Sequence, residues 1–275
     1  MMSENLPRRA SSRACSAVAD THRVEFISAG PGHPGLLTLS GAHRLARCGA
    51  VLAPAQFQTS FAKLLQGKVV ESPFPFHHDE VAAWVERHLP VSPVAFLVPG
   101  DFSVFNPFQS LAAHFGERSR ITPGVGAHAA AAAVLGKSFD MPRVAHATVL
   151  TSPKAFDHEG SPLQLRDYAR PGNTLVLFMN EMPLPELTAE LRAGFGRDTP
   201  IAILERIACP DERVSWGTLD NIALILGDHD PYKVGQDSAE PRLVLTVVGD
   251  ALGQDEQPEW WDERVDKMWR PRGMR

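Results

Sequence analysis

Two short loops carry the residue types best suited to holding a ligand through backbone groups. Residues 30–35 (GPGHPG) and 99–105 (PGDFSVF) each follow an apolar run that is typical of a buried strand. Because glycine has no Cβ, the amide and carbonyl groups around it can contact a ligand directly. In open α/β sheets, ligands bind beyond the carboxyl ends of the strands. The two loops are therefore predicted to form a ligand site; the alternative is a pair of tight strand-to-helix turns.

Neither loop matches a standard nucleotide-binding motif. The prolines of GPGHPG interrupt the helix start that G-x-G-x-x-G requires, and no Gly-Lys-Ser/Thr follows it. His77 and His78 stand beside two acids, but adjacent residues do not share a helix face. We interpret that segment as a solvated helix start and predict no metal site in the chain.

The segments that must position these loops alternate between strands and helices. In the first part of the chain, apolar runs predict strands at 24–30, 50–55 and 94–100, separated by helices at 40–50, 77–89 and 106–116. In the second part, strands are predicted at 147–152, 174–180, 200–207, 213–218 and 242–249, with helices at 123–136, 184–196 and 218–226. The alternation over the first hundred residues predicts a largely parallel sheet.

Composition excludes several classes of protein. A chain of 275 residues is long enough for two domains, and its net charge of -5 gives no basic surface for nucleic acid. No apolar run reaches the roughly 18 residues of a membrane-spanning helix. The three cysteines are odd in number and far apart, so the sequence indicates no disulfide framework. This usage fits a protein of the reducing cytoplasm. We expect a disordered tail over 1–22, with a mitochondrial presequence as the alternative, and a surface extension over 253–275.

A series of motifs in a fixed order resembles the tetrapyrrole (corrin/porphyrin) methylases. The matching segments are SAGPGHPGLLTLSG, VPGDFSVFN, PGVGAHAAAAAVLG, TLVLFMN, DTPIAILERIACPDERVSWGTLDNIA and LVLTVVGDAL. Together they cover roughly residues 23 to 252. Within the family, FDMPRVAHATVLTSP and the PDE segment are most similar to the precorrin-4 methyltransferases.

The resemblance implies a fold, a cofactor and a set of contacts. The fold is of the class III S-adenosylmethionine (SAM) methyltransferase kind, with two α/β domains over 23–120 and 121–252 and the active site in the cleft between them. The resemblance also implies a homodimer that binds SAM, releases S-adenosylhomocysteine and acts on a small molecule. The implied cofactor contacts are Pro31, Gly100, Asp101, Val104, Phe105, Gly126, Ala127, Phe178, Met179, Ala208 and Val248.

Departures from the family pattern bear on catalysis and substrate. His33 replaces the usual aspartate of the first loop; it is the candidate base, and its alternative role is to order that loop. Phe102 replaces a proline and Phe105 a tyrosine. After Thr151 the arginines of the precorrin-4 branch are absent and Lys154 faces new acids, including Asp157. We assign Phe102 and Lys154 to the substrate site.

These departures leave the substrate open. We expect methyl transfer to a precorrin-like tetrapyrrole or, because of the altered loops, to another small molecule. Precorrins carry several carboxylates, which need cationic partners once they are desolvated, so weak activity on precorrin-4 is predicted. The alternatives are a peptide or small-molecule methyltransferase outside cobalamin synthesis and a non-catalytic SAM-binding protein.

Overall fold

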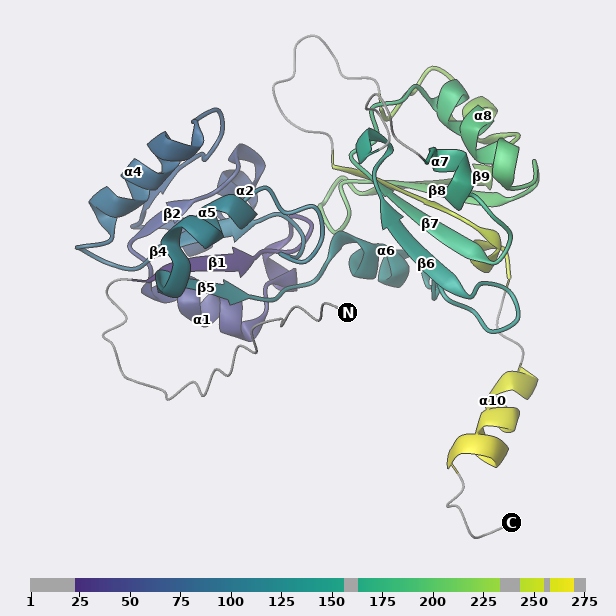
Figure 1. Cartoon of the computed structure of the whole chain (residues 1–275), viewed down its shortest axis with the longest axis horizontal. Coiled ribbons are helices and arrows are strands. Elements are labelled where there is room, and N and C mark those ends of the chain that lie inside the picture. Colours follow the sequence, from purple (N-terminus) through teal and green to yellow (C-terminus); the bar gives the residue numbers. More distant parts are fainter. Residues whose placement is uncertain (1–22, 156–162, 233–242, 255–257, 270–275) are drawn as a thin grey trace, which may run out of the picture.

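The computed structural model describes residues 23–155, 163–232, 243–254 and 258–269, which form two α/β halves. The first half holds one five-stranded sheet and the second half another (Figure 1). The predicted tail at 1–22 and residues 156–162 lie outside the described chain. No helix within the described residues is long and apolar enough to cross a membrane.

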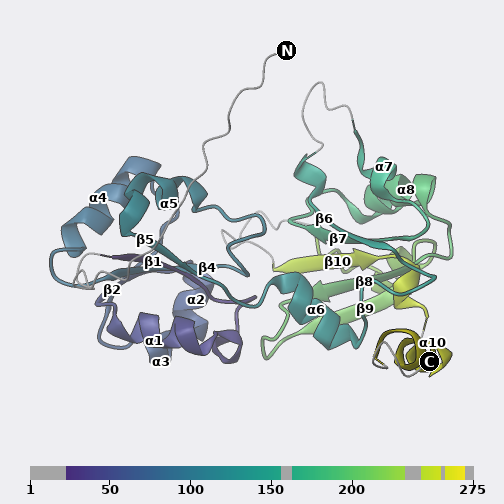
Figure 2. The same ribbon diagram turned by 60° about the horizontal axis from the view of Figure 1, so that its bottom comes forward.

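The sheet of the first half is parallel throughout. Its strand order is β3 (Val69–Glu71), β2 (Ala50–Leu52), β4 (Val94–Val98), β1 (Val24–Ser28) and β5 (Ser119–Thr122). Helices cover both faces, with α1 (Leu39–Arg47), α2 (Ala55–Ser60) and α3 (Ala62–Leu65) on one side and α4 (His78–His88) and α5 (Gln109–Phe115) on the other (Figure 2). This arrangement explains why β4 is apolar at every position and why every residue of β1, including Glu25 and Ser28, is buried.

Alternating side chains of β1 supply both cores of this half. The Phe26 ring stacks on Phe96 at 4.6 Å between centroids and packs under α4 and α5. Its neighbour Ile27 points to the opposite face and packs against the helices α1 to α3. Burial on both faces fixes the register of β1, because a slip of one residue would exchange the two sets.

The sheet of the second half is mixed. Its order is β6 (Ala147–Thr151), β7 (Asn173–Phe178), β10 (Val244–Val248), β8 (Pro200–Glu205) and β9 (Arg213–Thr218). Strands β6 and β7 are parallel, whereas β10 is antiparallel to both of its neighbours. Consequently the carboxyl ends of β6, β7 and β8 and the amino end of β10 share one edge of the sheet.

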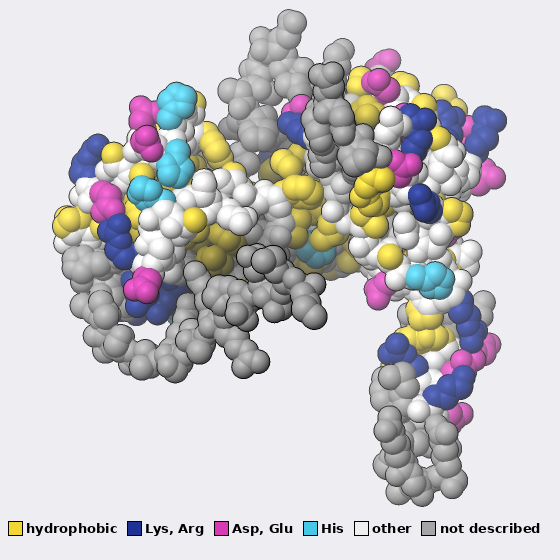
Figure 3. Space-filling view, viewed as in Figure 1, with side chains coloured by type: hydrophobic (Ala, Val, Ile, Leu, Met, Phe, Trp, Pro, Cys, Tyr) yellow, Lys and Arg dark blue, Asp and Glu magenta, His cyan; other side chains and the backbone are white. Residues whose placement is uncertain are grey.

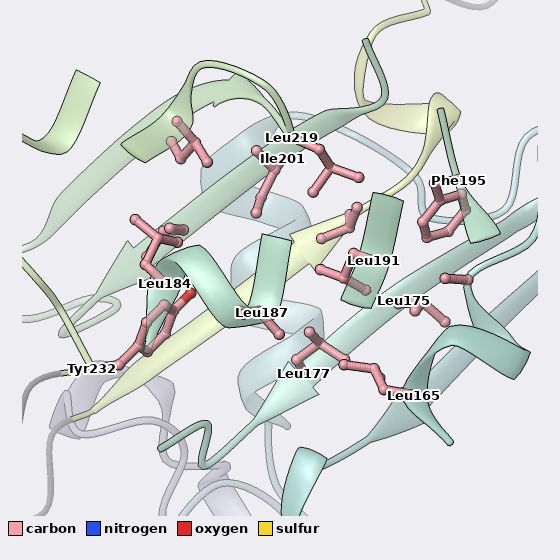
Figure 4. Packing of buried hydrophobic residues seen from close by; sticks show 14 of the residues in the cluster. Leu165, Leu175, Leu177, Leu184, Leu187, Leu191, Phe195, Ile201, Leu219 and Tyr232 are labelled. Atoms are coloured by element: carbon pink, nitrogen blue, oxygen red, sulfur yellow. The ribbon is translucent and has the colours of Figure 1, made fainter. Parts of the chain in front are cut away.

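Helices also cover this second sheet on two sides. The helix α6 (Ala127–Leu135) packs on one face, and α7 (Leu165–Tyr168), α8 (Leu184–Gly194) and α9 (Ile222–Leu226) cover the other. Figure 4 shows Leu187 and Leu191 of α8 beside Leu177 and Leu175 of β7. At the end of this cluster, the buried Tyr232 hydroxyl is hydrogen-bonded to Thr246 of β10.

The carboxyl-terminal segment stands apart from both sheets in Figure 1. It consists of α10 (Pro258–Arg264) and a π-helical turn (Val265–Trp269). Arg143 is within 2.8 Å of Glu263 and ties the segment to the second half. The segment falls within the extension expected over 253–275.

The predicted strands and main helices are present, with trimmed ends. The helix predicted over 218–226 begins only at Ile222, because Thr218 still belongs to β9 and donates its amide to Asn221 Oδ1. The strands β3 and β5 and the helices α2, α3, α7 and α10 were not predicted. The predicted domain boundary at 120/121 falls inside β5, and the division of the chain into domains stays a prediction.

Candidate functional site

The two glycine loops lie side by side at the carboxyl edge of the first sheet. Because β1 and β4 are neighbouring parallel strands, the loops that follow them meet. Gly30 and Gly100 exchange two backbone hydrogen bonds, of 3.1 Å from the Gly30 amide and 2.9 Å from the Gly100 amide. Both residues have positive φ, at 76° and 67°, a conformation that favours glycine.

A cavity opens between these loops and the second half. It encloses about 170 Å³, and about 820 Å³ together with its open mouth. Hydrophobic side chains gather on the facing sides of the two halves in Figure 3. The lining residues are Pro31, Phe57, Pro99, Gly100, Asp101, Val104, Phe105, Gly126, Ala127, Phe178, Met179, Ile207, Leu243, Val244 and Leu245. Asp101 is the only ionisable side chain among them.

All but two of the predicted cofactor contacts line this cavity. The two exceptions are Ala208 and Val248. Ala208 is next to the lining residue Ile207 but packs against the cluster under α6. Val248 is fully buried in the cluster between the second sheet and α8, on the face of the sheet opposite to α6. The structure brings the other predicted contacts together, although they come from loops far apart in the sequence.

The residues assigned to catalysis and substrate lie outside the cavity lining. His33 is exposed, and its Nδ1 accepts a 3.0 Å hydrogen bond from the Gly35 amide, so the ring orders its own loop. The half-buried Phe102 ring packs edge-on against the core residue Phe26 of the first half, with 5.9 Å between centroids. Phe102 is not among the residues that line the cavity, and its assignment to the substrate site stays a prediction.

Lys154 lines a second, more polar cavity of about 390 Å³. Its ammonium group is 2.5 Å from Glu181 Oε1, and Glu186 and Glu190 also line this space. The two cavities are neighbours, because the chain after β7 contributes Met179 to the first and Glu181 to the second. Glutamates outnumber the basic side chains here.

Unusual backbone conformations surround the first cavity. Phe105 and Met179 line it with φ of 48° and 49°. Arg206 and Ala208, with φ of 52° and 63°, flank the lining residue Ile207. Among the described non-glycine residues, only one other has positive φ. Such conformations cost on the order of 1–3 kcal/mol each and concentrate at ligand sites.

Part of the cavity lining was not predicted from the sequence. Phe57 comes from a helix that was not predicted, and Ile207 lies between two residues with positive φ that the sequence does not signal. Residues 243–245 line the cavity because β10 runs antiparallel, which places its first residues at this edge. No composition signal gives that orientation, although Pro99 could have been inferred from its place beside Gly100.

The charge of Asp101 is stabilised by the protein itself. Its Oδ2 accepts a 2.8 Å hydrogen bond from the Gly124 amide, and its Oδ1 accepts from the amide and hydroxyl of Ser103. Burial alone would raise the pKa of Asp101, but these bonds and one from Ser28 outweigh it, and the pKa lies below its usual value. Asp101 is therefore ionised at neutral pH.

The arrangement fits a ligand with an apolar body that is bound through backbone groups. A Cβ on Gly100 would meet nothing nearer than the Ala127 amide at 3.8 Å, so the glycine leaves open space between the halves. The helix α6 begins at this wall, after Gly126, and the amides of a first helical turn lack intrahelical partners. Among the described residues, no group of His, Cys, Asp and Glu side chains is arranged to hold a metal ion.

Comparison with known proteins identifies the family. The chain matches the Tetrapyrrole (Corrin/Porphyrin) Methylases over residues 23–223. It belongs to the tetrapyrrole methylase family. It is 31% identical to a precorrin-4 C(11)-methyltransferase of Sinorhizobium sp, over 91% of this chain and 99% of that protein. It is 32% identical to a protein of the same name from Rhodococcus erythropolis, over 86% and 94%.

Solved structures of tetrapyrrole methylases share the fold. A cobalt precorrin-4 methyltransferase superposes with a TM-score of 0.69 at 23% identity, over 84% of this chain and 96% of that one. A uroporphyrin-III C-methyltransferase from Thermus thermophilus, complexed with S-adenyl homocysteine, gives 0.61 at 25% identity, over 84% and 99%. The predicted family, fold class and enzyme class, a SAM-dependent methyltransferase, are confirmed.

Proposed function

We propose that this tetrapyrrole methylase transfers the methyl group of SAM to a precorrin-like tetrapyrrole, with SAM in the cavity between the halves. The observation that carries the proposal is the convergence of the predicted contact loops on that one cavity. The residues proposed to hold SAM are Pro31, Gly100, Asp101, Val104, Phe105, Gly126, Ala127, Phe178 and Met179. The tetrapyrrole substrate is supported by the names of the similar proteins.

The chemistry asks the chain mainly to position two reactants. When bound, SAM supplies an activated methyl: a bond forms from the substrate nucleophile to the methyl carbon, and the electrons of the broken S–CH3 bond stay on sulfur. Rigid loops and apolar walls suit such an alignment.

A base is needed only if the substrate loses a proton. We propose His33 for that role if the substrate reaches the rim, and His33→Gln would then lower kcat without changing SAM affinity.

Binding of the cofactor is the direct test. Calorimetry of the purified chain with SAM and with S-adenosylhomocysteine should give dissociation constants in the micromolar range, or about 8 kcal/mol of binding free energy. Absence of both heat and a thermal shift at millimolar ligand would contradict the proposal.

A less anionic substrate is the second candidate, and a charge argument favours it. Lys154 is already paired with Glu181, and further glutamates line the adjoining cavity. Arg166, the other basic side chain that lines this cavity, is also paired, 3.0 Å from Glu190. A carboxylate that enters this region would therefore have to compete with glutamates for its cationic partners, and an unpaired, desolvated carboxylate costs several kcal/mol. This argument favours a tetrapyrrole with fewer free carboxylates, or another small molecule.

One anaerobic assay separates the two candidates. The chain and SAM are incubated with precorrin-4 and with the same macrocycle whose side-chain carboxylates are converted to amides, and products are weighed by mass spectrometry. We expect slow or no methylation of precorrin-4 and faster methylation of the amide. Efficient gain of one methyl by precorrin-4 itself would establish the precorrin substrate and refute the charge argument.

We further propose that the chain is a cytoplasmic homodimer. Exposed apolar side chains on β9 and α9 support self-association: Trp216 is 41% exposed, Leu224 85% and Ile225 52%. Cys48 and Cys209 are free thiols, which favours a reducing compartment. Light scattering of the native chain and of Leu224→Asp would test the dimer, which the charged variant should weaken.

A further inference from the structure

Asp101 connects two parts of the chain that are distant in sequence. Its Oδ1 is bonded locally to Ser103, but its Oδ2 accepts from Gly124, which lies 23 residues further along. Gly124 belongs to the segment 123–126, through which the chain crosses from β5 of the first half to α6 of the second (Figure 1). One carboxylate therefore joins the second glycine loop to the crossing.

The crossing is also packed tightly against the end of β1. A Cβ on Gly124 would lie 2.5 Å from the carbonyl oxygen of Ser28, so only glycine fits there. The Ser28 hydroxyl is fully buried, and it accepts a 3.0 Å hydrogen bond from the Phe102 amide. Ser28, Asp101 and Gly124 thus form a polar junction where β1, the loop after β4 and the crossing meet.

The junction lies next to the cofactor cavity. Asp101 itself lines the cavity, and so do Gly126 and Ala127, which follow Gly124 at the start of α6. A shift of the crossing would move the amino end of α6, and with it one wall of the cavity. Displacements of about 1 Å at such a wall are enough to impair positioning of a reactant.

We propose that Asp101 is a positioning residue: through Gly124 it fixes the crossing, and thereby the start of α6, against the cofactor cavity. The proposal rests on the proposed function only for its consequence, the binding of SAM. Both carboxylate oxygens already accept hydrogen bonds from the protein, and the group keeps its charge at neutral pH. This bonding leaves Asp101 unsuited to act as a general base.

The test compares Asp101→Asn with Asp167→Asn. Asparagine keeps the volume of Asp101 but offers one acceptor oxygen and two N–H donors, so either Ser103 or Gly124 loses its partner. Asp167 is the matched control. It accepts a 2.7 Å hydrogen bond from the Gln164 amide, three residues earlier in the chain, and it does not belong to the crossing. Hydrogen exchange of the segment 123–130 is measured without ligand, followed by S-adenosylhomocysteine binding and steady-state kinetics.

Asp101→Asn should raise amide exchange of 123–130 about tenfold, while Asp167→Asn leaves it unchanged. The KM for SAM and the Kd for S-adenosylhomocysteine should rise about tenfold, and kcat at saturating SAM should change less than threefold. Unchanged exchange, or a collapse of kcat with unchanged Kd, would overturn the proposal. If the native chain does not bind S-adenosylhomocysteine, the proposed function fails, while the exchange result still judges the role of Asp101.

A measurement on the native chain covers the case in which Asp101→Asn does not fold. The amide proton resonance of Gly124 should shift in an acid titration together with the Asp101 carboxyl. A Gly124 amide resonance that does not shift as the Asp101 carboxyl titrates would refute the junction.

Discussion

At position 100 the backbone conformation, rather than any side-chain chemistry, decides which residue is allowed. Gly100 has a φ of 67° and pairs with Gly30 of the first loop, so its amide and carbonyl are already used in bonds between the two loops. The space that a side chain would occupy is the space between the two halves. A substitution there meets two separate costs, one in the backbone and one in the ligand site.

We expect Gly100→Val to weaken S-adenosylhomocysteine binding at least tenfold, or roughly 1.4 kcal/mol, in a protein that still folds. The backbone strain of a β-branched residue at this φ adds on the order of 1–3 kcal/mol of destabilisation. Gly67→Val is the matched control, because Gly67 has a φ of 77° and open space around it, yet does not line the cavity. Normal affinity in a folded Gly100→Val would show that the site lies elsewhere.

The bonds to Asp101 give stability a defined pH dependence. The folded-state pKa lies below the usual value of about 3.9, so the contribution is complete above that value and is lost as pH falls through the folded pKa. Denaturant unfolding between pH 6 and 2 should therefore show a gap between the native chain and Asp101→Asn that narrows in acid. A gap independent of pH would mean that the charge contributes nothing.

At the scale of elements, one aromatic contact between the halves is made by residues that follow or end a strand of each sheet. Phe105 follows β4, and Phe178 is the last residue of β7; their ring centroids are 5.1 Å apart at an interplanar angle of 46°. Both rings line the cavity. The contact thus joins the loop after β4 to the end of β7 across the proposed SAM cavity.

A double-mutant cycle of Phe105→Leu and Phe178→Leu should measure this contact. We expect a coupling free energy of about 0.5–1.5 kcal/mol in denaturant unfolding, because tilted aromatic pairs gain that much beyond their buried area. Phe26→Leu combined with Phe105→Leu serves as the control pair, since Phe26 packs in the core of the first half. A coupling equal to that control would mean that the two rings do not interact in solution.

The sequence predicted elements better than it predicted their surroundings. The strand β4 was recognisable because burial on both faces leaves a continuous apolar run, and β1 because its apolar residues are interrupted only by Glu25 and Ser28. The short β3 and β5 have exposed or half-buried residues and carry no such signal. The cavity wall from 243–245 depends on which strands pair, and the placement of Phe102 depends on Phe26, so neither follows from local sequence.

For the whole molecule, the proposed SAM cavity lies between the halves, so ligand binding there would couple to the stability of both. The lining comes from each half, so a ligand bound there stabilises their joined state. At a concentration 100 times its Kd, S-adenosylhomocysteine should add about 2.7 kcal/mol to the free energy of unfolding. Thermal unfolding should then move as one transition to a higher Tm. A shift confined to one of two resolved transitions would contradict binding between the halves.

The order in which the ribosome delivers the strands sets when this protein can first bind its ligand. The sheet of the first half is complete once Thr122 has emerged, so that half can fold during synthesis. The second sheet has β10 between β7 and β8, and β10 begins at Val244 of a 275-residue chain. Until then β7 and β8 have no partner between them and the cavity lacks a wall. A ribosome-bound chain stalled before that strand emerges would hold a folded first half and no cofactor.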